Sequence, residues 1–148
     1  MIDFTCVGDD REGCRCFIDF LVECNDDQGK TNGVVFLEVD EYQHSHYEVS
    51  CELRRMSDVH RSLIMEGNTI PIAFVRYNPH AFKVDAETKR TPLKVREERL
   101  VKFLNEMTFD KDFQVSYLYY DTTEDVPTIF HDASYDATFK QLVRHVIV

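Results

Sequence analysis

The alternation of apolar and polar positions predicts a β-hairpin followed by a helix and a buried strand. Residues 16–24 and 34–41 are rich in β-branched and aromatic side chains, and the stretch 25–33 between them is rich in Asp, Asn and Gly. This arrangement is typical of two strands joined by a turn. Residues 2–8 predict a short outer strand, and the near-continuously apolar residues 69–77 predict a strand covered on both faces.

Apolar positions at helical spacing predict three helices. The first runs from a Ser50 cap to Glu66, and Thr91 with Pro92 starts the second. Residues 115–121 then predict another strand, and Ser134 caps a third helix. The apolar faces are Leu53, Met56, Val59, Leu63 and Ile64 in the first helix, Leu93, Leu100, Leu104 and Met107 (with Arg96) in the second, and Phe139, Leu142, Val143 and Val146 in the third.

The order β-β-β-α-β-α-β-α predicts an α/β (α+β) fold with a mixed central sheet flanked by helices. A strand, a helix and a returning strand form a crossover, so we expect strands 34–41 and 69–77 to be parallel. The 148 residues, of which 43% are hydrophobic, are enough for one domain spanning residues 1–148. No segment reaches the roughly 18–20 apolar residues of a membrane span, and no signal peptide is evident. We therefore expect an intracellular protein, in the cytoplasm or nucleus, without a membrane partner.

Charge and cysteine content narrow the classes of function. The net charge of -10 argues against tight, nonspecific DNA binding by the domain alone, but it is compatible with acidic groups that hold a metal ion. Residues 83–102 carry seven basic and four acidic side chains, which indicates either a phosphate-contacting surface or a solvated helix face.

The five cysteines are an odd number, and we predict that they are reduced. Cys14 and Cys16 are separated by one residue, which is not the C-x2-C spacing of structural zinc sites.

Candidate chemistry is concentrated at the end of the second hairpin strand. Glu38 and Asp40 are two residues apart, so in a strand their side chains lie on the same face. Two neighbouring carboxylates repel each other unless a divalent cation or a shared proton lies between them. The simple alternative is an acidic strand end that is solvated.

The hairpin adds a third carboxylate to this pair. A turn centred near residue 29 places Asp19 opposite Val39, between Glu38 and Asp40. Because a buried, unpaired carboxylate is unfavourable, we expect Asp19, Glu38 and Asp40 to share one hard cation, Mg²⁺ or Mn²⁺. His44 follows Asp40 by four residues, and its pKa near neutrality suits a general base or a proton shuttle.

Four ordered motifs between residues 15 and 80 carry a family resemblance. They are Ile18-Asp19-Phe20, the run from Phe36 to Tyr47, the run from Cys51 to Met56, and the run from Pro71 to Pro79. Together they resemble restriction-endonuclease-like domains, in the branch near the very-short-patch repair endonuclease, in forms common in large DNA viruses and protists. The resemblance implies a PD-(D/E)XK core that binds Mg²⁺ and cleaves DNA phosphodiester bonds.

The resemblance also implies roles for individual residues. Asp19 would be the metal ligand of the "PD" strand, Glu38 and Asp40 the second-strand acids, and His44 the histidine of the family. Three further residues would line the site and meet phosphate: Arg55, Arg76 and Asn78. The chain departs from the family pattern in having Ile18 before Asp19 in place of proline, and Asp40 in place of the lysine.

Two functions remain open at this stage. The first is a metal-dependent nuclease acting on DNA, with RNA as a substrate that the sequence does not separate from DNA. The second is a catalytically inactive module of the same fold that binds a protein partner through its acidic surface. A homodimer is a further expectation for the nuclease, because a small enzyme needs two active sites to cut both strands.

Overall fold

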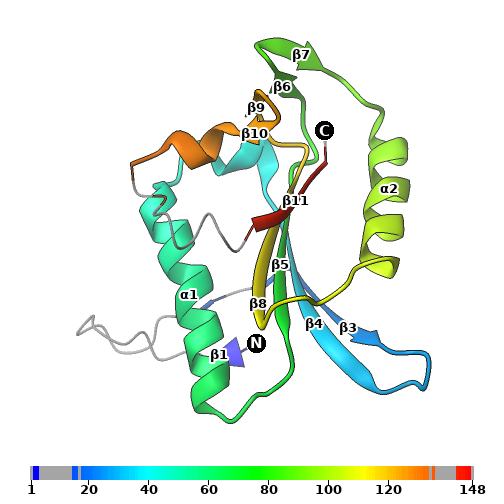
Figure 1. Cartoon of the computed structure of the whole chain (residues 1–148). Helices are drawn as coiled ribbons and strands as arrows, with labels where there is room; N and C mark the ends of the chain where they lie inside the picture. The colour runs from blue at the N-terminus through cyan, green and yellow to red at the C-terminus, as the bar shows by residue number, and fades with distance from the viewer. Residues whose placement is uncertain (1, 4–14, 17, 134, 136–142, 148) are drawn as a thin grey trace.

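A five-stranded sheet forms the centre of the protein (Figure 1). The computed structural model describes residues 2–3, 15–16, 18–133, 135 and 143–147. The sheet order is β11-β8-β5-β4-β3. Its strands are β3 (Phe20–Asn25), β4 (Thr31–Val39), β5 (Ile72–Tyr77), β8 (Phe113–Leu118) and β11 (Val143–Ile147). Strand β3 is antiparallel to β4, and the other neighbours are parallel, so the predicted mixed α/β fold is confirmed.

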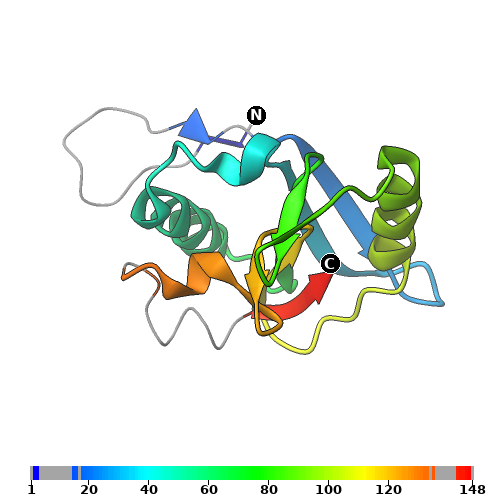
Figure 2. The ribbon, with the colours of Figure 1, turned by 90° about the horizontal axis from the view of Figure 1, so that it is seen from above.

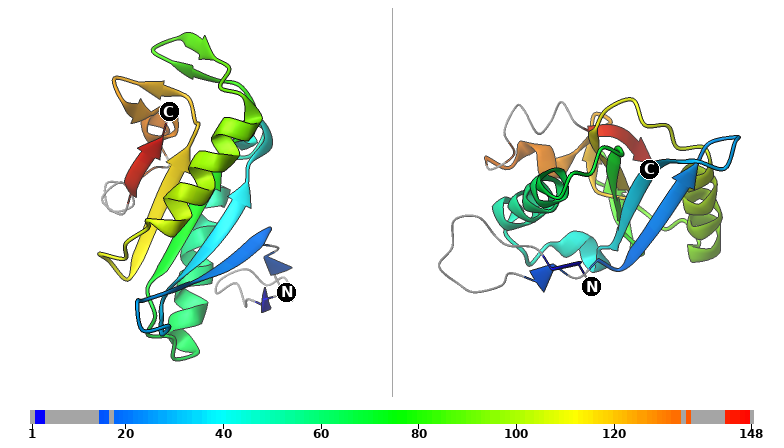
Figure 3. Two further views of the ribbon diagram at one scale, coloured as in Figure 1. Left: turned by 90° about the vertical axis from the view of Figure 1, so that its right-hand side faces the viewer. Right: turned by 90° about the horizontal axis from the view of Figure 1, so that it is seen from below.

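One long helix covers each face of this sheet. Helix α1 (Val49–Met65) connects β4 to β5 on one face, and α2 (Leu93–Asn105) connects β5 to β8 on the other (Figures 1 and 3). Alternate residues of the strands point to the two helices, so β5 has six buried residues in a row. The predicted apolar stripe of the first helix is confirmed for Leu53, Met56 and Val59, which are buried, and in part for Leu63, but Ile64 is 53% exposed.

Smaller elements surround the central sheet. A second sheet has the order β10-β9-β6-β7 and lies beyond the carboxyl ends of the parallel strands (Figure 1). Its strands are β6 (Phe82–Val84), β7 (Glu87–Lys89), β9 (Thr122–Thr123) and β10 (Val126–Pro127), followed by the 3-10 helix η2 (Thr128–His131). Near the N-terminus, β1 (Ile2–Asp3) pairs antiparallel with β2 (Arg15–Cys16). Within the described ranges, no helix has the length and apolar character needed to cross a membrane.

The hairpin is confirmed, but its edges differ from the prediction. The segment 16–24 is not one core strand, because β3 begins at Phe20 after a bend at Asp19. Since β3 is the edge strand, Phe20 and Leu21 stay 56% and 51% exposed. Strand β4 ends at Val39, and the next residues form the 3-10 turn η1 (Glu41–His44).

The last predicted helix is wrong over the part that the structure describes. Residues 143–147 form β11, which pairs in parallel with β8 through Val143↔Val115 and Val146↔Tyr117. These β-branched residues pair with the open edge of β8, and this tertiary pairing prevails over the apolar spacing that indicated a helix. Ser134, Phe139 and Leu142 lie outside the described residues, as do residues 4–8 of the predicted outer strand.

Candidate active site

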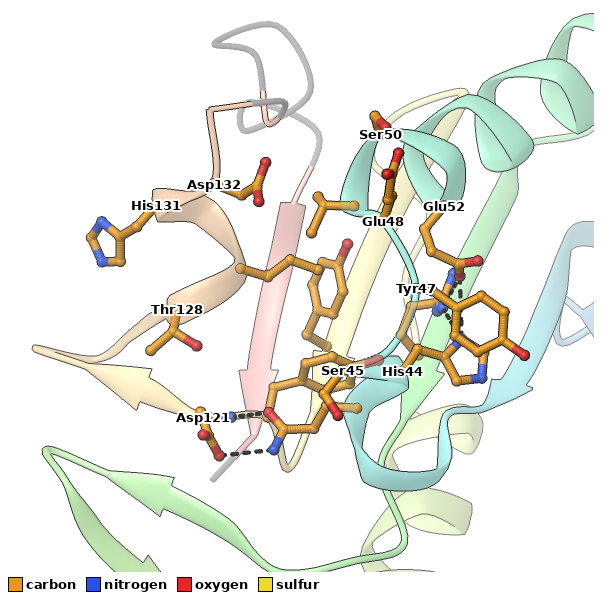
Figure 4. A pocket seen from close by; sticks show the side chains of 16 residues that line it. His44, Ser45, Tyr47, Glu48, Ser50, Glu52, Asp121, Thr128, His131 and Asp132 are labelled. Carbon is orange, nitrogen blue, oxygen red and sulfur yellow. Dashed lines mark hydrogen bonds and ion pairs between the residues drawn. The ribbon is translucent and has the colours of Figure 1, made fainter.

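The carboxyl ends of β4, β5 and β8 meet at one edge of the sheet, which is where ligands bind in open α/β sheets. Asp40 directly follows β4, and Asp121 lies shortly after β8. A cavity of about 660 Å³ lies at this edge (Figure 4). Its walls come from η1 and the turn after it, the first residues of α1, and η2, with Arg76 among the lining residues. Figure 2 views these elements from the same end of the sheet.

A buried ionic cluster lies between the sheet and α1 at this edge. Asp40 is 0% exposed, and its Oδ2 accepts hydrogen bonds from Arg76 Nε at 2.5 Å and from the Tyr120 hydroxyl. Arg76 also donates through Nη2 to Glu52 of α1. The other Asp40 oxygen, Oδ1, lies 3.3 Å from His44 Nδ1 and has no hydrogen-bond donor among the described residues. Arg76 therefore holds two carboxylates from different elements in one place.

An ion pair between Glu38 and Arg55 lies next to this cluster. Glu38 is buried, and its Oε2 accepts a hydrogen bond from Arg55 Nη2 at 2.9 Å. The same Arg55 nitrogen lies 3.6 Å from Glu52 Oε2, so Arg55 bridges the strand and the helix. Glu38 of β4 and Asp40 just after it both lie on the α1 face and pair with Arg55 and Arg76 there, as their two-residue spacing predicts.

Asp19 does not join these groups as predicted. It is exposed, and its Oδ2 accepts a hydrogen bond from the backbone N–H of Val39 at 2.8 Å. The strand register pairs Phe20 with Leu37, one residue away from the register that the turn suggested. Asp19 therefore lies close enough to Glu38 for its negative charge to contribute to raising the Glu38 pKa, but its own side chain is exposed to solvent and not buried.

The structure brings together a different set of potential metal ligands. Within the described part of the chain, only Asp40, His44 and Glu52 form a group of three or more His, Cys, Asp or Glu residues with ligand atoms within 4.8 Å of one another. Glu52 was not predicted as a site residue. The sequence feature that could have identified Glu52 is its spacing from Arg55. The two residues are three positions apart in the first turns of a helix, so their side chains lie on one face.

The charges of the cluster do not balance. Glu38, Asp40 and Glu52 contribute three negative charges when ionised, and Arg55 and Arg76 contribute two positive charges, which leaves a net charge of -1. Burial raises the pKa of Glu38 although the two arginines oppose this shift. Burial also raises the pKa of Glu52, but Arg76 and Arg55 outweigh it and hold this pKa below its usual range. A proton or a cation would neutralise the remaining charge.

The turn that delivers His44 has an unusual backbone. Tyr42, Gln43 and His44 have φ values of 55°, 60° and 49°, all in the left-handed region. For residues other than glycine this conformation costs about 1–2 kcal/mol each. Such a conformation persists only where surrounding contacts determine it, and these sites are often functional. The side chain of Gln43, which sequence reasoning did not single out, provides such a contact with Asp121.

The three predicted phosphate-contacting residues have different surroundings. Arg76 lines the cavity but is nearly fully buried, and Arg55 is 27% exposed. Asn78 is completely buried, donates to the Tyr119 carbonyl at 2.8 Å and accepts from the His80 backbone N–H at 3.0 Å. The side chain of Asn78 therefore joins the ends of β5 and β8, and this geometry gives no support to its predicted contact with nucleic acid.

None of the residues of the basic segment 83–102 is among those that line the cavity. Its helical part is α2, on the opposite face of the sheet from α1. Arg96, one of its seven basic residues, is buried and donates to the backbone carbonyls of Asn78 and His80 at 3.2 and 2.6 Å.

No family model, no curated protein and no solved structure matches the chain, so function is inferred from the site itself.

Proposed function

We propose that this protein is a nuclease that hydrolyses phosphodiester bonds of DNA with a divalent cation held at the cavity. The observation that carries the proposal is the group of Asp40, His44 and Glu52, with ligand atoms within 4.8 Å of one another at the carboxyl edge of a parallel sheet. The two carboxylates suit Mg²⁺ or Mn²⁺, and the imidazole favours a transition-metal ion such as Mn²⁺ over Mg²⁺. The proposed reaction is the one that the family resemblance implies, whereas the proposed metal-holding residues differ from the implied set.

The donor set fits a cation in two further respects. Asp40 Oδ1 is a buried carboxylate oxygen without a hydrogen-bond donor among the described residues. The cluster also lacks one positive charge when its acids and arginines are ionised. We therefore assign Asp40, His44 and Glu52 as the metal-holding residues, in place of the predicted set of Asp19, Glu38 and Asp40. When bound, the cation would polarise a phosphate oxygen and acidify a water molecule.

The arginines serve this site by orienting its acids. Arg76 uses Nε for Asp40 and Nη2 for Glu52, so it fixes the positions of both carboxylates. Arg55 is paired with Glu38 but is partly exposed, and its guanidinium is the one suited to meet a phosphate oxygen at the edge of the site.

The charge of the cavity makes the cation a requirement for substrate binding. Among the described residues that line the cavity, four are acidic, Glu48, Glu52, Asp121 and Asp132, and Arg76 supplies the single guanidinium. A phosphodiester carries negative charge, so these carboxylates repel it unless a cation lies between them. We expect cleavage to depend strictly on a divalent cation.

A non-enzymatic module that binds a protein partner is the second candidate. It is favoured by Phe20 and Leu21, which are about half exposed on the edge strand β3. An edge strand presents unpaired backbone groups that can pair with another chain. This candidate predicts no cleavage of nucleic acid under any metal condition.

The test compares two acids that the prediction and the structure treat differently. Calorimetry with Mn²⁺ and Mg²⁺ is performed on the wild type, on Glu52→Gln and on Asp19→Asn, followed by cleavage assays on DNA and RNA. We expect Glu52→Gln to weaken Mn²⁺ binding at least about tenfold, as loss of a metal-site partner does. Asp19→Asn, a matched loss of one exposed carboxylate, is expected to keep the affinity.

Either of two results would overturn the assignment. Loss of Mn²⁺ binding in Asp19→Asn alone would support the predicted metal-ligand set of Asp19, Glu38 and Asp40 instead. Absence of Mn²⁺ and Mg²⁺ binding at millimolar concentration in the folded wild type, with no cleavage of DNA or RNA, would favour the partner-binding module.

A further inference from the structure

The 3-10 turn η1 is held by a side-chain contact that spans 78 residues of sequence. Gln43 Nε2 donates to Asp121 Oδ1 at 2.8 Å, and the backbone N–H of Asp121 donates to Gln43 Oε1 at 2.7 Å. Figure 4 shows these two bonds as dashed lines that end at Asp121. From this geometry we propose that Gln43 is a positioning residue, which fixes the left-handed turn and thereby places His44 beside Asp40 and Glu52.

The turn needs such a contact because its backbone is strained. Tyr42, Gln43 and His44 are three consecutive residues at positive φ, and none of them is glycine. The backbone bonds from Gln43 N to Asp40 O and from Tyr47 N to His44 O close the turn locally, but they lie within the same segment. The Gln43 amide ties the turn to the segment after β8. Tyr42 adds a contact to the segment after β5, because its backbone N–H donates to His80 Nδ1 at 3.3 Å and its ring stacks on the His80 ring.

Asp121 is itself a fixed anchor. It follows β8 closely, and its Oδ1 also accepts the backbone N–H of Lys83 at 2.8 Å, just inside β6. The bond to Gln43 therefore connects the segment after β4 with the segments after β5 and β8. All three segments lie at the carboxyl edge of the sheet, where the cavity is found.

The residue after Gln43 is the one whose position matters for the site. His44 Nδ1 lies 3.3 Å from Asp40 Oδ1 and 3.4 Å from Glu52 Oε2. Its ring also packs against the Tyr47 ring, with the centroids 4.7 Å apart. A change in the left-handed backbone at Gln43 would redirect the His44 side chain away from both acids. The importance of this placement for metal binding rests on the proposed function, whereas the placement itself does not.

The chemistry of the contact explains why a glutamine stands at position 43. A side-chain amide carries both a donor group, NH₂, and an acceptor oxygen, and Asp121 needs both, a donor for its carboxylate and an acceptor for its backbone N–H. Glutamate would offer acceptors only and would place a second carboxylate against Asp121. Asparagine at position 121, in contrast, keeps both the Oδ1 acceptor and the backbone N–H.

The experiment compares Gln43→Ala, Gln43→Glu and Asp121→Asn, with Gln28→Ala as the matched control in an exposed turn. Two measurements are made on the full chain: the nuclear Overhauser effect between the His44 and Tyr47 rings, and Mn²⁺ affinity by calorimetry. Both Gln43 variants are expected to lose the ring contact and to bind Mn²⁺ at least about tenfold more weakly. Asp121→Asn and Gln28→Ala are expected to retain both properties.

The outcomes separate this inference from the proposed function. A ring contact and a Mn²⁺ affinity that persist in Gln43→Ala would overturn the positioning role. An equal loss in Gln28→Ala would do the same, because the effect would then not be specific to the contact with Asp121. If the wild type shows the ring contact but binds no Mn²⁺, the proposed metal site fails, and the ring contact alone decides the role of Gln43.

Discussion

The two faces of the central sheet are built from alternate residues of the same strands, yet they differ in polarity near the carboxyl ends of β4 and β5. In the middle of β4 and β5 both faces are apolar, with Phe36 and Phe74 toward α1 and Val35 and Val75 toward α2. Toward α2 the apolar character continues to Tyr77 at the end of β5. Toward α1 it changes to Glu38 and Arg76 before the strands end. The ionic groups are therefore a local feature of one face at one edge.

Two buried arginines make this difference concrete. Arg96 lies on the α2 face, donates to two backbone carbonyls and lies over the Tyr119 ring, 5.6 Å from its centroid. Arg76 lies on the α1 face and donates to the carboxylates of Asp40 and Glu52. The first supports a loop, whereas the second orients acids that adjoin a cavity. Burial of an arginine alone does not indicate a site; the chemistry of its partners does.

The largest effect is expected from removing Arg76. Arg76→Met would leave Asp40 buried without its counterion, and breaking a buried ion pair in this way costs about 3–5 kcal/mol. Arg96→Met leaves carbonyl acceptors unsatisfied, which costs about 1–3 kcal/mol. Urea unfolding measures both. The double variant Arg76→Met/Asp40→Asn should be more stable than Arg76→Met, and a greater loss in Arg96→Met would reverse the comparison.

A bound cation should stabilise the α1 face specifically. Mn²⁺ at about 100 times its dissociation constant would add about 2.7 kcal/mol to the free energy of unfolding. Thermal unfolding with and without Mn²⁺ is expected to show this gain in the wild type and in Glu97→Gln, which removes an exposed acid from α2. Glu52→Gln is expected to lose it. A similar gain in Glu52→Gln would indicate that the ion binds elsewhere.

A substitution at Gly33 tests the packing of the α2 face. A Cβ added at Gly33 would lie 2.2 Å from Phe109 Cζ, a ring that packs against the core cluster on this face. Gly33→Ala should therefore destabilise the protein by about 1–3 kcal/mol, the usual range for overpacking. In a cycle with Phe109→Leu, the double variant should lose less than the sum of the single variants. Additive losses would show that the cost of Gly33→Ala does not arise from contact with the Phe109 ring.

The smallest effect is expected at the other end of the α1 face. His60 stacks on Phe113 with the ring centroids 4.5 Å apart, and burial lowers its pKa from the ordinary value of 6.5, with Asp112 opposing the shift. The folded state therefore binds the proton less readily than the unfolded state, so stability falls as the pH drops below about 6.5. His60→Gln should remove this part of the slope in urea unfolding between pH 5 and 7. An unchanged slope would assign it to other groups.

Much of the fold followed from local patterns in the sequence. The stripe of Leu53, Met56 and Val59 predicted the buried face of α1, and the two-residue spacing of Glu38 and Asp40 predicted their common face. These patterns are reliable because the period of a helix or a strand alone decides which side chains share a face. The register of the hairpin was predicted to within one residue, and that residue changed the surroundings of Asp19.

The sequence by itself determined the hairpin, the helices α1 and α2, the strands β5 and β8, and the presence of acids at the end of β4. Only the tertiary structure decided which of these acids meet. Glu52 joins Asp40 because Arg76, from the neighbouring strand, bonds to both, and Gln43 meets Asp121 across 78 residues. Likewise, residues 143–147 became a strand because β8 offered an open edge. Contacts between distant segments depend on how the strands are ordered, and local periodicity carries no information about that order.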